Sequence, residues 1–232
     1  MEDSKVCPFS KLKSSNLDYS NLDCLKKTPC PVLNSVINMG YLNPEGEFTY
    51  KNIRSAFRRI KVSDNYSFVF FNIIRGILRR NNKKMTVKCL QTPNLIEHAV
   101  SLSREDYNMG RGNHICYNRK RFNLIFKYFK NQKYISLKEL IDYKYSLFKK
   151  SCKETDNLQF GVKEWTVTMV EMAMIYRLLS TDKGLCLKTL QKVFANETLH
   201  GVEINSIDLL NVGNNFIQSA GFWVQSVIKD KL

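Results

Sequence analysis

Apolar residues recur along most of this chain at the three- and four-residue spacing that buries one face of a helix. Residues 31–39 show the pattern over a short stretch, with Val32, Leu33, Val36 and Ile37 on one face. The same spacing predicts further helices from Thr49, over 66–80, from 136 to about 150, over 163–180, over 185–195 and from about 205 to 220. The 66–80 segment is apolar enough that we expect its helix to be buried.

Short local motifs mark where two of these elements begin or end. Ser136 and Glu139 have the spacing of a capping box, and Ile135 with Leu140 forms the hydrophobic staple that accompanies such a box. Asn43–Gly46 has proline at its second position and glycine at its fourth, which is typical of a β-turn. A helix is therefore expected to begin at residue 136, and a turn to follow the 31–39 helix.

A strand-like pattern is confined to the alternating segment MTVKCLQ, residues 85–91. Only 10 Gly and 5 Pro in 232 residues argue against a turn-rich β fold, and a hydrophobic share of 44% is enough for a core. No internal repeat is evident and no linker divides the chain. We therefore expect one mostly α domain over 1–232, a helical bundle with at most a short β-hairpin.

The chain is strongly basic, with 36 Lys and Arg against 21 Asp and Glu and a net charge of +15. Such an excess suits nucleic acid, an anionic membrane surface or simple solubility. The basic residues are scattered, however, and the sequence contains no finger, RRM or KH motif. We expect no specific nucleic-acid partner, and association with an anionic surface through this charge stays open.

The remaining composition bears on compartment and redox state. The most apolar run, Phe68 to Leu78, is short and contains Asn72 and Arg75, so no transmembrane segment is expected. The N-terminal stretch MEDSKVCPFSKLKSS lacks the apolar centre of a secretory signal, which predicts a cytoplasmic or otherwise intracellular protein. Seven cysteines fit neither a disulfide framework nor a zinc motif, which predicts reduced thiols.

Cys30 differs from the other cysteines because Pro31 follows it at the predicted start of a helix. Proline suits the first helical position, which makes Cys30 the N-cap and points the amides of Val32 and Leu33 at its sulfur. Those donors and the helix dipole lower the pKa of a thiol. Such a thiolate is a nucleophile, a redox centre or a metal ligand. The alternative is a buried, inert thiol that precedes a helix.

The segment PCPVLNSVINMGYLNPEG, residues 29–46, resembles the proximal motif of the fungal haem-thiolate peroxidases, the chloroperoxidase and unspecific peroxygenase family. The family pattern reads roughly PCP-x-LN-x-L-x-NHG-[YI]-L-x-x-x-G. The resemblance implies that the bundle encloses haem b and that the sulfur of Cys30 is the axial ligand of its iron. Met39 stands where the family has His.

A second segment, EHAVSLSREDY at residues 97–107, resembles the EHD-x-S-x-SR-x-DY segment of the same family. The resemblance implies that Glu97, Ser101 and the backbone carbonyl of His98 ligate Mg²⁺ or Mn²⁺ beside a haem propionate. It also implies that His98 lies on the distal side with a catalytic role. Glu97 and Ser101 are four residues apart, so a helix would bring them together. Ala99 replaces the aspartate that orients the family's histidine.

A third candidate, Glu171, stands out because a carboxylate lies within an apolar helical stripe. Desolvation in such a place raises a carboxyl pKa and makes the group a functional candidate, with a buried salt bridge as the ordinary alternative. Its neighbours one and two helical turns away are Val167, Thr168, Met174, Ile175 and Leu178. VEMAMIYRLLSTD also resembles the family segment whose glutamate is the distal acid–base catalyst, which implies that role for Glu171.

Together these segments predict a haem-thiolate peroxidase or peroxygenase domain, with the resemblance running from Thr28 to about His200. The expected reaction uses hydrogen peroxide to oxidise or oxygenate a small, apolar or aromatic substrate, or to oxidise halide. One alternative is a degenerate family member that binds haem without turnover. The other is a basic helical module without haem that binds nucleic acid or membrane, in which Cys30 is structural.

Overall fold

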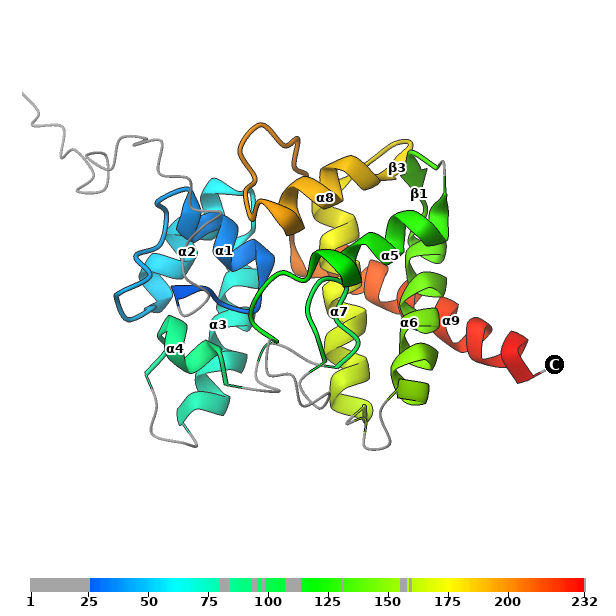
Figure 1. The fold of residues 1–232 in the computed structure, drawn as a ribbon. Helices are drawn as coiled ribbons and strands as arrows, with labels where there is room; N and C mark the ends of the chain where they lie inside the picture. The colour runs from blue at the N-terminus through cyan, green and yellow to red at the C-terminus, as the bar shows by residue number, and fades with distance from the viewer. Residues whose placement is uncertain are drawn as a thin grey trace, which may run out of the picture.

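In a computed structural model, the described residues are 26–79, 84–92, 96, 99–106, 114–130, 132–154, 158 and 160–231. Over these residues the fold is mostly helical (Figure 1). The helices are α1 (Pro31–Asn38), α2 (Tyr50–Arg59), α3 (Asp64–Arg79), α4 (Val87–Leu90), α5 (Arg119–Phe129), α6 (Leu137–Glu154), α7 (Val162–Leu179), α8 (Leu187–Ala195) and α9 (Leu209–Lys231). In this part of the chain, no helix is long and apolar enough to cross a membrane.

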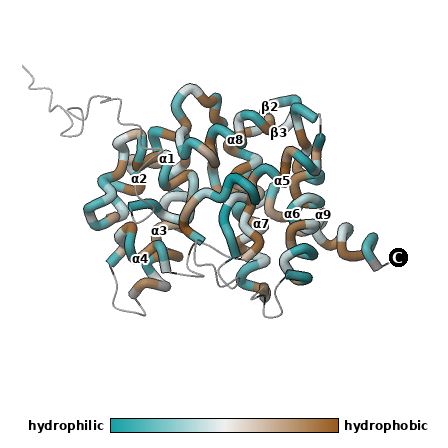
Figure 2. The backbone as a smooth tube through the Cα atoms, viewed as in Figure 1, coloured by the Kyte–Doolittle hydropathy of each residue, from teal (hydrophilic) through white to brown (hydrophobic). Residues whose placement is uncertain are grey.

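Helix α7 runs through the middle of the molecule, with α1 to α4 on one side of it and α5, α6 and α9 on the other (Figure 1). It packs against both α6 and α9, and α1 packs against α8. Brown apolar segments and teal polar segments alternate along each helix in Figure 2, as expected when one face is buried. This arrangement places the start of α1 and the middle of α7 on the same core.

A small antiparallel sheet joins the helices at one end of the described structure. Its strands are β1 (Tyr134–Ile135), β2 (Ser180–Thr181) and β3 (Gly184–Cys186), in the order β1-β3-β2. Gly184 has a φ of +106°, and a Cβ there would lie 2.7 Å from the carbonyl oxygen of Ile135. The turn between β2 and β3 and the close approach of β1 therefore both need a glycine.

Local motifs explain why several helices begin where the sequence predicts. Glu139 Oε2 accepts the Ser136 N–H at 2.8 Å, while Ser136 Oγ accepts the Glu139 N–H at 3.2 Å. Ile135 and Leu140 are both buried beside this box. Thr49 caps α2 through its side-chain oxygen. The predicted capping box and the predicted helix after Thr49 are confirmed.

The strand predicted from MTVKCLQ is wrong, because its residues form α4. Thr86 Oγ1 accepts the N–H of Cys89 at 3.3 Å, and this cap begins a helical turn where the alternation predicts a strand. The sheet instead uses short segments beside α6, α7 and α8 that carry no alternation long enough to read. Local capping outweighs a weak two-residue periodicity here.

Helix α3 is also less buried than its composition predicts. Phe68, Val69 and Ile73 lie on its outer face, and more than half of Phe68 and Ile73 is exposed, at 56% and 60%. Tyr66 and Phe71 face the core. Helix α9 runs to Lys231, well beyond the predicted end near 220, because apolar residues such as Trp223 continue to reach the core.

The cysteines of the described residues divide into two groups. Cys30, Cys89, Cys152 and Cys186 are free. Cys116 is disulfide-bonded, so the expectation of reduced thiols is wrong at that position. The free thiol of Cys30 is what a ligand role requires.

Candidate active site

Cys30 lies at the mouth of α1, as the sequence predicts. Its backbone is extended, with φ −92° and ψ 116°, and Pro31 takes the first helical position. The carbonyl of Cys30 accepts the N–H of Asn34 at 3.0 Å, which closes the first turn of the helix. The residue as a whole is half-buried, and it packs against the hydrophobic core with its thiol free.

Burial raises the pKa of the Cys30 thiol to about 11, although the amides of Leu33 and Val32 and the charge of Arg104 act in the opposite direction. Glu171 adds to the rise. The two amides lower the pKa as the sequence predicts, but burial outweighs them. A cation bound to sulfur offsets this desolvation, which fits a metal ligand better than a free nucleophile.

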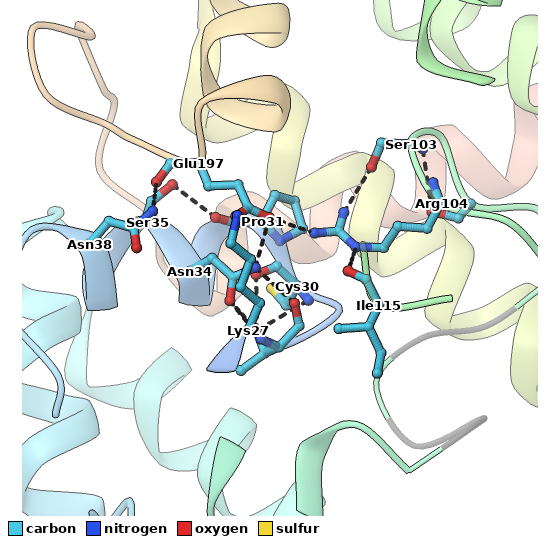
Figure 3. Close-up of polar contacts among 12 residues, drawn as sticks. Lys27, Cys30, Pro31, Asn34, Ser35, Asn38, Ser103, Arg104, Ile115 and Glu197 are labelled. Carbon is cyan, nitrogen blue, oxygen red and sulfur yellow. Dashed lines mark hydrogen bonds and ion pairs between the residues drawn. The ribbon is translucent and has the colours of Figure 1, made fainter. Parts of the chain in front are cut away.

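Asn34 fixes the segment that leads into α1. Its Oδ1 accepts both the N–H of Thr28, at 2.8 Å, and the Thr28 hydroxyl, at 2.9 Å. Its Nδ2 donates to the Thr28 carbonyl at 2.8 Å and to Oε1 of Glu197 at 2.8 Å (Figure 3). Both Asn34 and Thr28 are fully buried, so these bonds have no competing water. The chain on either side of Cys30 is thereby held rigidly.

Glu197 is buried beside the same helix, and its carboxylate contacts several residues there (Figure 3). Its Oε1 accepts from Asn34 and from the guanidinium of Arg104, the latter at 2.8 Å. Its Oε2 lies 2.9 Å from Nζ of Lys27, at an angle that does not satisfy a hydrogen bond. Glu197 has a φ of +48°, a backbone conformation that residues other than glycine rarely adopt. The surrounding contacts hold it there.

Arg104 connects Glu197 to the segment after the second motif. It is 1% exposed, and its guanidinium also donates to Ser103 Oγ at 2.8 Å and to the carbonyl of Ile115 at 2.9 Å. Segments far apart in sequence therefore meet behind Cys30. We call Lys27, Asn34, Arg104 and Glu197 the proximal cluster. Sequence reasoning missed it, although Arg104 lies within the segment EHAVSLSREDY that resembles the family.

A second buried carboxylate, Asp106, orders the loop around Ser101. Asp106 Oδ1 accepts the N–H of Val100 at 2.6 Å and lies 3.2 Å from the guanidinium of Arg121, while Oδ2 accepts the Ser151 hydroxyl at 2.6 Å. Val100 has a φ of +70°, which is strained for a β-branched residue. Strain of this kind is common at functional sites, and here Asp106 supports it.

Only part of the predicted cation site falls within the described residues. Glu97 and His98 lie outside them. Ser101 is buried, its Oγ accepts the N–H groups of Ser103 and Arg104 at 3.4 and 3.3 Å, and its carbonyl accepts from Arg121 at 2.7 Å. Residues 99–106 form bends and no helix, so the argument from helical spacing fails there. The described residues contain no cluster of three His, Cys, Asp or Glu.

Glu171 lies on α7 among buried neighbours, as predicted: Thr168, Ile175 and Leu178 are all buried. Its carboxylate is paired, because Oε2 accepts from Nζ of Lys144 on α6 at 3.1 Å. The Glu171 side chain is 21% exposed and that of Lys144 is 0% exposed. The salt bridge kept as the alternative is therefore present. Sequence spacing could not reveal it, since the partner comes from another helix.

Tyr66 is a site residue that the sequence did not single out. It is buried on α3, and its hydroxyl donates to the sulfur of Met174 on α7 at 3.2 Å. Burial, and then the charge of Cys30, raise the pKa of Tyr66 well above its ordinary range. Cys30 thus interacts electrostatically with both Tyr66 and Glu171. Residues from α1, α3 and α7 therefore surround one region of the interior.

Comparison with known proteins identifies the family of the chain. The model of the family described as "Peroxidase, family 2" matches residues 25–214, which include Cys30, Ser101, Glu171 and Glu197. No curated protein matches the chain. A match of that length covers α1 to α8 and the beginning of α9. The chain therefore belongs to peroxidase family 2.

Proposed function

We propose that this chain is a haem-thiolate peroxidase or peroxygenase that uses hydrogen peroxide to oxidise or oxygenate a small apolar or aromatic substrate. Family membership supports the peroxidase part of the proposal. The observation that carries the thiolate part is Cys30, a free, half-buried thiol at the N-cap of α1 with amides and Arg104 acting on its sulfur. Oxidation of halide by the same site is a narrower variant of this proposal.

The residues around Cys30 fit haem b. The thiol is free, its burial disfavours an anionic sulfur without a cation, and the proximal cluster keeps the start of α1 in one position. Cys30 would hold the iron through its sulfur. When bound, haem supplies the redox chemistry, and a thiolate ligand favours cleavage of the O–O bond of peroxide.

Glu171 would move the proton. Its carboxylate accepts the proton of one peroxide oxygen and delivers it to the other, so the group ends the step as it began. Its position on α7 beside buried apolar residues limits the access of water. His98 would assist on the same side, with its orientation less constrained because Ala99 replaces the family's aspartate. Tyr66 and Met174 would form part of the apolar surroundings.

We also propose that Glu97, the backbone carbonyl of His98 and Ser101 bind Mg²⁺ or Mn²⁺. Oxygen ligands suit a hard cation of this kind. The support is the resemblance of the 97–107 segment, together with the buried Ser101 hydroxyl. Elemental analysis of the purified protein tests this directly, and the absence of stoichiometric Mg²⁺ or Mn²⁺ would contradict it.

The deciding experiment is an absorption spectrum of the full chain produced with haem supplied, reduced and exposed to carbon monoxide. Wild type should show the red-shifted band of a thiolate ligand, and Cys30→Ala should lack it. Cys89→Ala is a matched control, because Cys89 is also free and half-buried but lies on α4. An unchanged band in Cys30→Ala would overturn the proposal.

A second measurement separates the remaining alternatives. Peroxide-dependent oxidation of an aromatic dye by the haem-loaded chain supports an active enzyme. The thiolate band without any oxidation would instead indicate a degenerate haem-binding member. No haem uptake, with salt-dependent binding to polyanions, would indicate a basic binding module.

A further inference from the structure

Lys144 is a fully buried lysine at the centre of α6. Its side chain is 0% exposed, although lysine is almost never completely buried unless it is paired. The ammonium lies 3.1 Å from Oε2 of Glu171, a contact that is both a hydrogen bond and an ion pair. Buried charges need such a partner, because the cost of removing an ammonium from water is several kcal/mol. The two side chains therefore depend on each other.

The two partners are unequally buried, and this difference indicates from which side Lys144 reaches the carboxylate of Glu171. Lys144 is completely enclosed, whereas 21% of the Glu171 side chain remains accessible. The lysine thus approaches the carboxylate from the protein side and binds one oxygen. The accessible part of the Glu171 side chain leaves it partly open to its surroundings, and its carboxylate also acts electrostatically on Cys30.

We propose that Lys144 is a positioning residue for Glu171, holding Oε2 so that the carboxylate keeps one orientation for proton transfer. This inference rests on the proposed peroxidase function. Lys144 keeps its own protons throughout: the proton that Glu171 takes from one peroxide oxygen is the proton that it returns to the other. Lys144 itself contacts neither peroxide nor substrate. Its effect is exerted entirely through the geometry of Glu171.

The test uses the haem-loaded full chain in five forms: wild type, Lys144→Met, Lys144→Arg, Glu171→Gln and the double variant Lys144→Met/Glu171→Gln. Lys138→Met is the matched control, because Lys138 is on the same helix and pairs with Asp142 at the surface. The reaction with peroxide is followed by stopped-flow absorption at matched haem content. The ferrous–carbon monoxide band serves as a check that Cys30 is unaffected.

We expect Lys144→Met to slow the reaction with peroxide by about 10²-fold, the typical consequence of displacing a catalytic group by ~1 Å. Lys144→Arg should restore most of the rate, since it keeps a cation in reach of Oε2. The double variant should react no more slowly than Glu171→Gln alone, because Lys144 acts only through Glu171. A wild-type rate in Lys144→Met, or a double variant slower than Glu171→Gln by the full effect of Lys144→Met, would overturn the proposal.

Two further features keep the test decisive. If Lys144→Met does not fold, a double variant that reacts more slowly than Glu171→Gln would still overturn the proposal, and the double variant itself leaves no unpaired buried charge. Denaturant unfolding of the same variants measures the coupling of Lys144 and Glu171 without any reference to activity. A wild-type chain that binds haem but does not react with peroxide would refute the proposed function, while the unfolding data would still show whether the pair is coupled.

Discussion

Replacing Glu197 by alanine should destabilise the protein severely. The proximal cluster brings two cations, Lys27 and Arg104, to a single carboxylate. Arg104 is 1% exposed and cannot turn to water when Glu197 is removed. Asn34 also loses the acceptor at 2.8 Å that fixes the far side of its amide. The variant therefore leaves a buried guanidinium and a buried amide group without their partner.

The magnitude follows from these losses. Removing one partner of a buried pair costs about 3–5 kcal/mol, because the remaining charge is uncompensated. For a domain of this size, each kcal/mol shifts Tm by roughly 2–4 °C, which gives a fall of about 6–20 °C. Backbone strain does not contribute to the difference, since alanine and glutamate carry the same Cβ at φ +48°. Glu197→Gln keeps an acceptor for Arg104 and should cost less, about 1–3 kcal/mol.

The assay is denaturant unfolding followed by circular dichroism on the haem-free chain, so that cofactor binding does not mask the effect. Glu203→Ala provides a matched control, because Glu203 is exposed in the same connection between α8 and α9. If Glu197→Ala unfolds within ~1 kcal/mol of wild type, the argument from an uncompensated buried charge fails.

Two more predictions concern glycine and cysteine positions. Gly184→Ala should destabilise the protein by more than ~1 kcal/mol in thermal unfolding, since a Cβ would lie 2.7 Å from the Ile135 carbonyl oxygen. Gly221→Ala, on the open outer face of α9, should instead stabilise the protein by about 0.5–1 kcal/mol. Equal effects of the two substitutions on stability would contradict this reasoning. Burial alone would raise the pKa of Cys186, but the hydrogen-bond donors of Thr189, the amide of Lys188 and the charge of Lys133 together lower it. At Cys152, burial raises the pKa of the thiol. Because the thiolate is the reactive form, iodoacetamide should modify Cys186 at lower pH than Cys152, and Lys133→Met should move the Cys186 profile to higher pH; coincident profiles would refute the assignment.

Helices were predictable because their signals are local. The α1 stripe, the proline after Cys30 and the capping box at Ser136 all act within a few residues, and each produced the expected helix. The short strands β1, β2 and β3 were not predictable, because two- or three-residue strands carry no readable alternation and depend on distant partners. Thr86 shows the opposite case: its cap is visible in the sequence, but the alternation over residues 85–91 led to a predicted strand where the structure has α4.

The candidate site likewise contains residues that the sequence identifies and partners that it does not. Cys30 and Glu171 were identifiable because each is out of place in its own helix, a thiol at an N-cap and an acid in an apolar stripe. Their partners come from other segments: Arg104 and Glu197 lie 74 and 167 residues after Cys30, and Lys144 lies 27 residues before Glu171. Spacing within one helix carries no information about such contacts. The net pKa of Cys30 was not predictable for the same reason, because burial outweighs the amides and depends on the whole fold.

The charges of the two ionic groups bear on the proposal that the sulfur of Cys30 binds a cation. Lys27 and Arg104 carry two positive charges and Glu197 one negative charge, so the proximal cluster has an excess of one positive charge. Lys144 and Glu171 balance each other. An uncompensated charge within a buried cluster is costly, and a thiolate at Cys30 supplies the opposite charge within reach of Arg104. Burial of the sulfur outweighs that positive charge, so under the proposed function the bound cation is what would hold the sulfur as a thiolate.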